Sequence, residues 1–174
     1  MSELEIRAAT TEDRAAIKAV FKSHARERDW KYAKRYFESY FDHPERHQDE
    51  RVLVGVKEGR VAGLIGWLRD RRGAPGIFWL GWYYVHADDR GAGLGKIMLD
   101  HVVREVRALG ARKLYTDTAS SPFYERARRR YTQLGFTEAG ALQDYYWEGE
   151  HQLFYVMELT DDLEPGGEAG RQEP

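Results

Sequence analysis

HADDRGAGLGKIML, residues 86–99, places glycine at three alternate positions directly before an apolar pattern of helical spacing. Glycine loses more conformational entropy on folding than other residues, so Gly91, Gly93 and Gly95 need a structural reason. A helix start exposes unpaired backbone N–H groups, its dipole favours an anion, and glycine keeps side chains out of the way. The stretch therefore predicts a phosphate-binding loop; the alternative is a plain tight turn.

The spacing excludes two common nucleotide motifs. A dinucleotide fingerprint, G-x-G-x-x-G, needs its third glycine one residue later than Gly95. A P-loop, G-x-x-x-x-G-K-[ST], would have its first glycine at Arg90 and its hydroxyl residue at Ile97. An unrelated nucleotide-binding protein is accordingly the weakest interpretation.

Apolar runs of strand length and segments of helical period alternate along the chain. In order they predict a strand at 4–10, helical faces at 17–24 and 30–41, strands at 51–56, 61–68 and 76–85, a helix at 94–109, a strand at 112–118, a helix at 122–134, and a hairpin of 136–147 with 151–159. A strand, helix and strand within one sheet imply a right-handed crossover and a parallel pair. The order predicts one α+β domain with a mixed sheet, residues 1–160, and a flexible tail, residues 161–174.

The composition limits the compartment and the partners. The 174 residues contain no cysteine, which excludes a disulfide scaffold, a thiolate metal site and a cysteine nucleophile. We therefore expect a cytoplasmic protein without a metal. No apolar run approaches the roughly 20 residues that span a bilayer, and a net charge of −2 provides no field to attract nucleic acid. We expect neither a membrane nor a nucleic-acid partner.

The motif R-x-x-G-x-G, residues 90–95, follows YYVHADD and precedes KIML. In this setting it resembles the acetyl-CoA loop of the GCN5-related N-acetyltransferase (GNAT) superfamily, and the order of elements over roughly residues 4–159 agrees. The resemblance implies a mostly antiparallel sheet of roughly six to seven strands with about four flanking helices. It also implies acetyl-CoA as cofactor, with its pyrophosphate on the loop and its pantetheine arm beside the 76–85 strand. The cofactor-binding residues would be Tyr83, Tyr84, Val85, Arg90, Gly91, Ala92, Gly93, Leu94, Gly95, Lys96 and Tyr124.

A second motif, YTQLGF at 131–136, resembles a family signature at the end of the helix after the fifth strand. In many members its tyrosine donates a proton to the departing coenzyme A thiolate, and by position that role falls on Tyr131. The alternative is a tyrosine that only fills core space. The resemblance further implies that a backbone amide near Val85 polarises the thioester carbonyl.

The general base is the least determined part of the site. Several relatives carry a glutamate six residues before the position of Val85, where this chain has Trp79. Asp117 resembles a carboxylate found near there in some protein-acetylating relatives, although it could equally cap the following helix. A water chain, or an acceptor amine that is already partly neutral, would serve as well.

Three further features near the motifs have a structural and a functional interpretation. Where the family often has an asparagine that contacts the cofactor, this chain has Tyr124, so the contact is either lost or made by the phenol. His86 is expected to have a structural or phosphate-side role rather than to act as a base. The arginines of residues 126–130 are expected to be mostly solvated, although one or two could reach the 3′-phosphate of coenzyme A or an acidic substrate.

The acceptor is expected to lie between the first two helices and the final hairpin. These segments are rich in aromatic residues and carry negative charge at the hairpin: Trp30, Tyr32, Tyr36, Tyr145, Tyr146, Trp147, Glu148 and Glu150. That character suits a cationic amine, but ordinary packing or a homodimer contact would use the same residues. A small amine, a peptide N-terminus, a lysine and an antibiotic all remain open as acceptors.

Taken together, these patterns predict an acetyl-CoA-dependent N-acetyltransferase that transfers the acetyl group directly to a primary amine. Tyr131 would be its general acid, and Asp117 is the candidate base. An acyl-CoA-binding sensor without turnover is the alternative, favoured by the missing Glu at position 79 and the missing Asn at position 124.

Overall fold

The computed structural model describes residues 4–160, so the predicted tail, residues 161–174, lies outside the described residues. The elements are β1 (Leu4–Ala8), α1 (Arg14–Lys22), α2 (Glu27–Asp42), β2 (Glu50–Lys57), β3 (Arg60–Arg69), β4 (Ile77–Val85), α3 (Leu94–Ala108), β5 (Lys113–Ala119), α4 (Glu125–Gln133), β6 (Thr137–Trp147) and β7 (Glu150–Glu158). Within residues 4–160, no helix combines the length and the apolar character needed to cross a membrane.

The seven strands form one sheet in the order β1-β2-β3-β4-β5-β7-β6. Every neighbouring pair is antiparallel except β4 and β5, which are parallel because α3 connects them as a crossover. The predicted α+β class and the mixed, mostly antiparallel sheet are confirmed.

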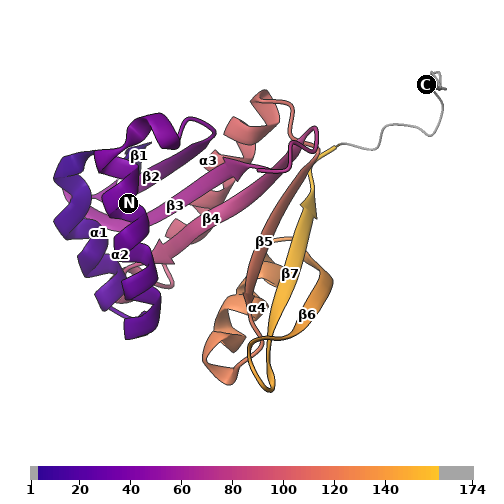
Figure 1. Ribbon diagram of the computed structural model, residues 1–174. Helices are drawn as coiled ribbons and strands as arrows, with labels where there is room; N and C mark the ends of the chain where they lie inside the picture. The colour runs from indigo at the N-terminus through magenta and orange to yellow at the C-terminus, as the bar shows by residue number, and fades with distance from the viewer. Residues whose placement is uncertain (1–3, 161–174) are drawn as a thin grey trace.

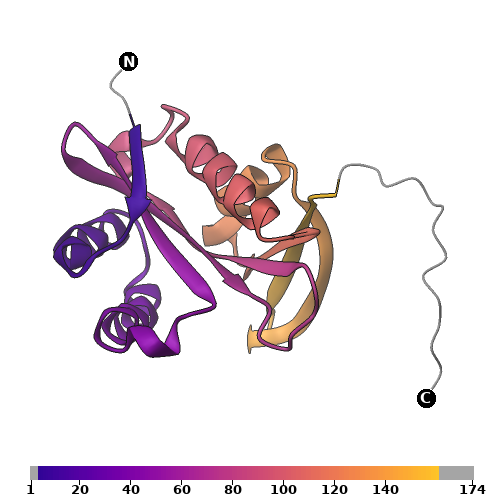
Figure 2. The same cartoon turned by 90° about the horizontal axis from the view of Figure 1, so that it is seen from above.

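The helices cover both faces of the sheet, and each face has its own buried core (Figures 1 and 2). On one face, α1 and α2 pack against β2 to β4 around the fully buried ring of Phe21. On the other face, α3 and α4 pack around Met98, Leu114 and Phe136. Complete burial of such side chains contributes about 1.5–3 kcal/mol each.

α3 begins and ends at glycines, and its apolar side chains face the sheet. Gly93 precedes it with a φ of 80°, and Gly110 follows it with a φ of 84°, a left-handed conformation that glycine adopts without strain. Its buried residues recur at helical spacing: Leu94, Met98, Leu99, Val102 and Val106. This packing fixes the position of the helix N-terminus relative to the end of β4.

The sheet divides between β4 and β5. These strands pair over only three residues, from Ile77–Lys113 to Trp79–Tyr115, and then diverge. A β-bulge lies close to this divergence, because Gly66 of β3 falls opposite both Gly81 and Trp82 of β4. Bulges bend and twist a strand. The remainder of β4 therefore has an edge that no strand of residues 4–160 pairs with, and Figure 1 shows β5 splayed away from it.

Candidate active site

A cleft of about 1440 Å³ lies where the sheet divides. Its walls come from β4, the glycine loop and the start of α2 on one side, and from β5, α4 and the β6–β7 hairpin on the other. Most of the predicted site residues line it: Tyr83, Tyr84, Val85, Arg90, Gly91, Gly93, Leu94, Gly95, Asp117, Tyr124 and Tyr131. The fold thus brings together residues that are far apart in the sequence. Two other predicted cofactor-binding residues, Ala92 and Lys96, are exposed and do not line the cleft.

The glycine loop offers open space in front of the first turn of α3. Gly91 and Gly93 have φ values of 87° and 80°, and a Cβ atom at either would meet nothing within 4 Å. The third glycine has a different reason: a Cβ on Gly95 would lie 2.6 Å from the hydroxyl oxygen of Tyr83. The backbone of the loop is thus bare and opens on the cleft at a helix N-terminus, a geometry that suits an anion.

Positive charge surrounds this loop. Burial of the Arg90 guanidinium lowers its pKa, and the nearby Arg126 lowers it further. Within residues 4–160 no carboxylate forms an ion pair with either of these arginines. Two uncompensated guanidinium groups beside a bare helix N-terminus favour an anion there.

The helical arginines are less uniformly solvated than the sequence suggested. Arg128 donates hydrogen bonds to the backbone oxygens of Ala119 and Ser121, at 2.8 and 2.9 Å. It therefore fastens α4 to the end of β5, and it is an exception to the expectation that most of these arginines are solvated. Arg129, in contrast, is exposed and only 3.8 Å from the carboxylate of Glu125.

His86 has the structural role that was expected for it. Its ring Nδ1 accepts a hydrogen bond from the backbone N–H of Asp88 at 3.3 Å, which caps the short 3-10 turn Ala87–Asp89 between β4 and the glycine loop.

Tyr131 is a buried phenol at the bottom of the cleft. Its side chain is 9% exposed, and the rings of Phe136 and Tyr155 lie 5.7 Å from its own. Burial raises the pKa of Tyr131 to about 12, against the opposite effect of a hydrogen bond with Thr116. The hydroxyl is therefore protonated at neutral pH, and Tyr131 lines the same cleft as the glycine loop.

Asp117 lies on β5 and also lines the cleft. Its carboxylate accepts a hydrogen bond from Nε2 of Gln152 at 2.8 Å, and burial raises its pKa despite this bond. It is not the cap of the following helix, because Ser121 and Tyr124 occupy the positions before the next two helical segments. A half-buried carboxyl with a raised pKa is a better proton acceptor than an exposed one.

Trp79 occupies the position where some relatives have a base, and its role is structural. Its indole N–H donates to Oδ1 of Asp70 at 3.1 Å, and its ring packs 5.2 Å from that of Tyr115. The ring contact lies within the short β4–β5 ladder, and the bond to Asp70 ties β4 to the segment before it. Trp79 also lines the cleft.

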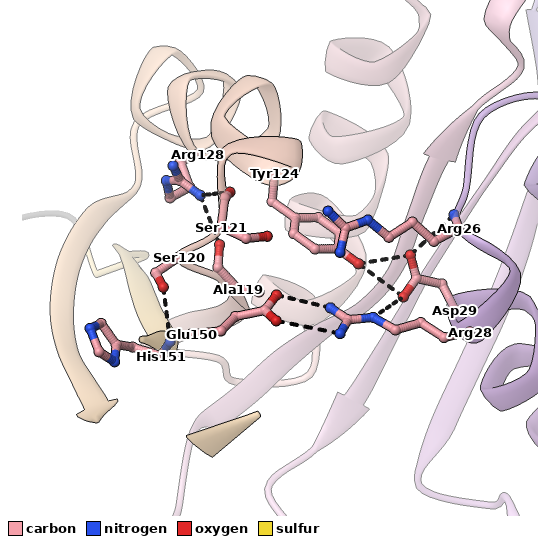
Figure 3. Close-up of polar contacts among 10 residues, drawn as sticks. All are labelled: Arg26, Arg28, Asp29, Ala119, Ser120, Ser121, Tyr124, Arg128, Glu150 and His151. Atoms are coloured by element: carbon pink, nitrogen blue, oxygen red, sulfur yellow. Dashed lines mark hydrogen bonds and ion pairs between the residues drawn. The ribbon is translucent and has the colours of Figure 1, made fainter. Parts of the chain in front are cut away.

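Four polar side chains bridge the mouth of the cleft, and we call them the clasp: Arg28, Asp29, Tyr124 and Glu150. The hydroxyl of Tyr124 donates to both carboxylate oxygens of Asp29, at 2.9 and 2.8 Å. The guanidinium of Arg28 donates to the carboxylate of Glu150 at 3.0 and 3.4 Å. Figure 3 shows these bonds reaching from α2 on one side to the segment before α4 and to β7 on the other. The phenol that stands where the family has asparagine is thus held across the cleft.

The expected acceptor-side aromatics divide into two groups. Tyr32, Tyr145, Tyr146 and Trp147 line the cleft, as predicted. Trp30 instead packs 5.7 Å from Phe21 in the core, and the hydroxyl of Tyr36 donates to Oε2 of Glu50 at 2.8 Å. Neither residue lines the cleft, so for these two the alternative of ordinary packing holds.

Several polar and aromatic residues of the cleft were not predicted as site residues, among them His24, Arg28, Asp29 and Trp82. The helical period of α1 suggested only that His24 faces the core. The two charged residues lie in the first turn of α2, where charge is common in any helix. Trp82 lies at the bulge of β4, which no sequence pattern predicted.

Residues 17–136 match the model of the acetyltransferase (GNAT) family, and the chain belongs to that family. A solved protein from Desulfovibrio desulfuricans assigned to the GNAT family is 22% identical, with a TM-score of 0.83 over 91% of this chain and 100% of that one. The ribosomal-protein-S18-alanine N-acetyltransferase of Escherichia coli is 20% identical, with a TM-score of 0.73 over 98% of this chain and 100% of that one. A Salmonella typhimurium protein described as an acetyltransferase, solved with acetyl-CoA, is 22% identical, with a TM-score of 0.67 over 94% and 98%. No curated protein sequence matches the chain.

The family model confirms the resemblance read from the glycine motif and places the chain in the enzyme class of acyltransferases. The structural likeness, at these identities, concerns the fold.

Proposed function

We propose that the protein is an acetyl-CoA-dependent N-acetyltransferase that transfers the acetyl group directly to a primary amine. The observation that carries the proposal is one cleft that joins a bare, left-handed glycine loop to a buried phenol and a carboxyl of raised pKa. Family membership and the Salmonella typhimurium relative solved with acetyl-CoA support it.

The residues of the cleft fit coenzyme A chemically. The space in front of Gly91 and Gly93 accommodates phosphate oxygens against backbone N–H groups, and Arg90 and Arg126 supply compensating charge. The unpaired edge of β4 at residues 83–85 accommodates an extended amide chain, which would bind as an added strand.

The bound cofactor would supply the activated thioester, and residues of the chain would supply the proton transfers. A backbone N–H near Val85 would polarise the thioester carbonyl, since β5 does not pair with β4 there. Asp117 would accept a proton from the attacking amine, and Tyr131 would donate one to the departing sulfur. The two titrating groups lie on the β5–α4 side of the cleft, so amine and thioester would be held together there.

The acceptor side combines aromatic walls with carboxylates. Tyr32 and Trp82 lie with ring centroids 5.9 Å apart at this end of the cleft, which also contains Asp29 and Asp117. This lining supports an acceptor that is a small amine or a peptide amine. We keep homodimerisation and a cytoplasmic location as expectations of the same proposal.

The decisive experiment measures acetyl-CoA binding by calorimetry and free-thiol release across a panel of amines, polyamines, aminoglycosides and peptides. Thiol release that depends on one acceptor class would establish the enzyme and name its acceptor. Tight binding without release from any acceptor would favour the sensor, for which the bridging of Tyr124 to Asp29 is the supporting observation. Absence of acetyl-CoA binding would contradict both functions.

A further inference from the structure

His24 lies just after α1 and lines the cleft, and neither motif includes it. Its ring packs against that of Tyr84 on β4, with centroids 5.4 Å apart. The residue before it, Ser23, connects the end of α1 to the turn that precedes the glycine loop, because its Oγ accepts the backbone N–H of Ala87 at 3.1 Å.

The hydrogen bonds of Ser23 determine which nitrogen of His24 carries the proton. The single hydroxyl proton of Ser23 is donated to the backbone oxygen of Val20 at 2.7 Å. The 2.9 Å contact between Ser23 Oγ and His24 Nδ1 then requires the proton of that bond to come from the imidazole. His24 is therefore assigned as the Nδ1–H tautomer, which leaves a bare lone pair on Nε2.

That lone pair has no partner within residues 4–160. Every hydrogen bond of the His24 ring is made by Nδ1, and Nε2 is not one of the buried polar atoms that lack a partner. It is thus accessible, and the large space that His24 lines is the cleft.

The surroundings of His24 keep it neutral. Burial lowers its pKa to about 4, and the neighbouring Arg90, His86 and Arg126 lower it in the same direction. A neutral ring protonated at Nδ1 cannot donate from Nε2, which disfavours a phosphate oxygen as its partner, since that oxygen also needs a donor. The two guanidinium groups repel an ammonium ion as well. The partner must be an uncharged N–H or O–H group.

We propose that His24 is a cofactor-binding residue whose Nε2 accepts a hydrogen bond from an amide N–H or the hydroxyl of the pantetheine arm. This rests on the proposed binding of acetyl-CoA, whose pantetheine portion carries neutral donors and would lie along β4 beside Tyr84. Ser23 is a positioning residue, since it holds the tautomer that makes Nε2 an acceptor.

The first test is the tautomer itself. Long-range ¹H–¹⁵N NMR of the free protein should show His24 protonated at Nδ1 and unprotonated at Nε2 at pH 7. A signal from the opposite tautomer, or from a charged ring, would overturn the assignment. In Ser23→Ala, the same spectrum should show a mixture of tautomers.

The second test separates pantetheine from phosphate recognition by using acetyl-CoA and adenosine 3′,5′-bisphosphate, which has no pantetheine. His24→Phe keeps an aromatic ring against Tyr84 but removes the acceptor, and His24→Gln restores one. We expect His24→Phe to weaken the binding of acetyl-CoA about tenfold and that of the bisphosphate less than about twofold. His24→Gln should recover part of the lost affinity for acetyl-CoA.

Three results would contradict the inference in different ways. If His24→Phe weakened the binding of both ligands equally, the ring would only support the glycine loop. If His24→Phe left the affinity for acetyl-CoA unchanged but raised the KM of the acceptor, Nε2 would bind the acceptor amine instead of the pantetheine arm. If the wild-type chain bound neither ligand, the proposed function itself would fail first.

Discussion

At the scale of single residues, the cleft brings together two groups whose proton affinities are shifted by burial. Burial favours the neutral form of both Tyr131 and Asp117, because both are acids. For the phenol this secures a proton at neutral pH. For the carboxyl, burial raises the pKa and so makes the carboxylate a stronger proton acceptor. The same burial makes the folded state less stable when the carboxyl is ionised.

Tyr131→Phe removes the proposed proton donor and retains the ring that packs against Phe136 and Tyr155. We expect kcat to fall by about 10²-fold or more, the usual range for a lost general acid, with the dissociation constant of acetyl-CoA nearly unchanged. Steady-state kinetics and calorimetry on the same preparations measure both. A kcat close to that of the wild type would remove Tyr131 from the chemistry.

Asp117→Asn should lower turnover by about 10²-fold and raise thermal stability at pH 7. A carboxyl whose pKa is raised on folding stabilises the fold while protonated, and this contribution is lost as the pH rises through the folded pKa. The ionised carboxyl therefore destabilises the folded state at neutral pH, and the uncharged amide of the Asn variant removes this destabilisation. Tm values of both proteins at pH 7 and pH 4 test this; the difference should shrink at the lower pH. A less stable Asn variant at pH 7 would contradict the linkage.

The pH profile of turnover gives an independent check on Asp117. A base must be ionised, so kcat should rise with pH through the raised pKa of the carboxyl and then level off, and the Asn variant should lack that rise.

At the scale of elements, the glycine loop and α3 depend on two different constraints. Positive φ keeps side chains away from Gly91 and Gly93, whereas close contact with β4 excludes a side chain at Gly95. Substitutions can therefore separate the binding role of the loop from its packing.

Gly93→Glu should abolish cofactor binding, since it places a carboxylate against the proposed site of the pyrophosphate. Gly73→Glu is the matched control: its φ of 78° imposes the same backbone strain, also with open space around Cβ, in the turn between β3 and β4. Both variants should lose similar stability, about 1 kcal/mol, in urea unfolding. Retained calorimetric binding by Gly93→Glu would contradict the loop assignment.

Gly95→Ala places a methyl group 2.6 Å from the Tyr83 hydroxyl oxygen. We expect a loss of about 1–3 kcal/mol in the free energy of unfolding, as for other overpacked cores. Tyr83→Phe removes the clashing oxygen, so the double variant should recover most of the loss. Additive effects of the two substitutions in a double-mutant cycle would rule out this contact as the cause.

At the scale of the whole molecule, the order of the helices and strands could be predicted from the sequence, but the separation of β4 from β5 and the contacts across the cleft could not. Apolar period and glycine punctuation locate α3 and the strands around it, because these signals are local. The bulge opposite Gly66 and the bonds of the clasp depend on residues up to 122 positions apart, as in Arg28 and Glu150, and no local pattern encodes them. The two motifs predicted residues of the cleft such as Tyr131. The place of His24 and Asp29 in the cleft depends on contacts with residues distant in the sequence, which only the structure shows.

The clasp is the polar link between the two sides of the cleft. Tyr124→Phe removes one hydrogen bond to a carboxylate, which should cost about 1.5 kcal/mol of unfolding free energy, the lower end for bonds to charged groups. Tyr145→Phe is the control, since that side chain is 57% exposed and its hydroxyl has no bond to Asp29. Equal stabilities of the two variants in urea would show that the clasp adds nothing to the fold.

The three-residue ladder between β4 and β5 has a consequence for solubility. Beyond it, the two strands present unpaired N–H and C=O groups to each other across a gap, and such edges are templates for aggregation. A ligand whose amides bond to β4 would occupy one edge, and acetyl-CoA would then act as a small-molecule chaperone of the fold. Light scattering on heating should accordingly begin at a higher temperature with saturating acetyl-CoA, and adenosine 3′,5′-bisphosphate, which leaves the edge open, should delay it less.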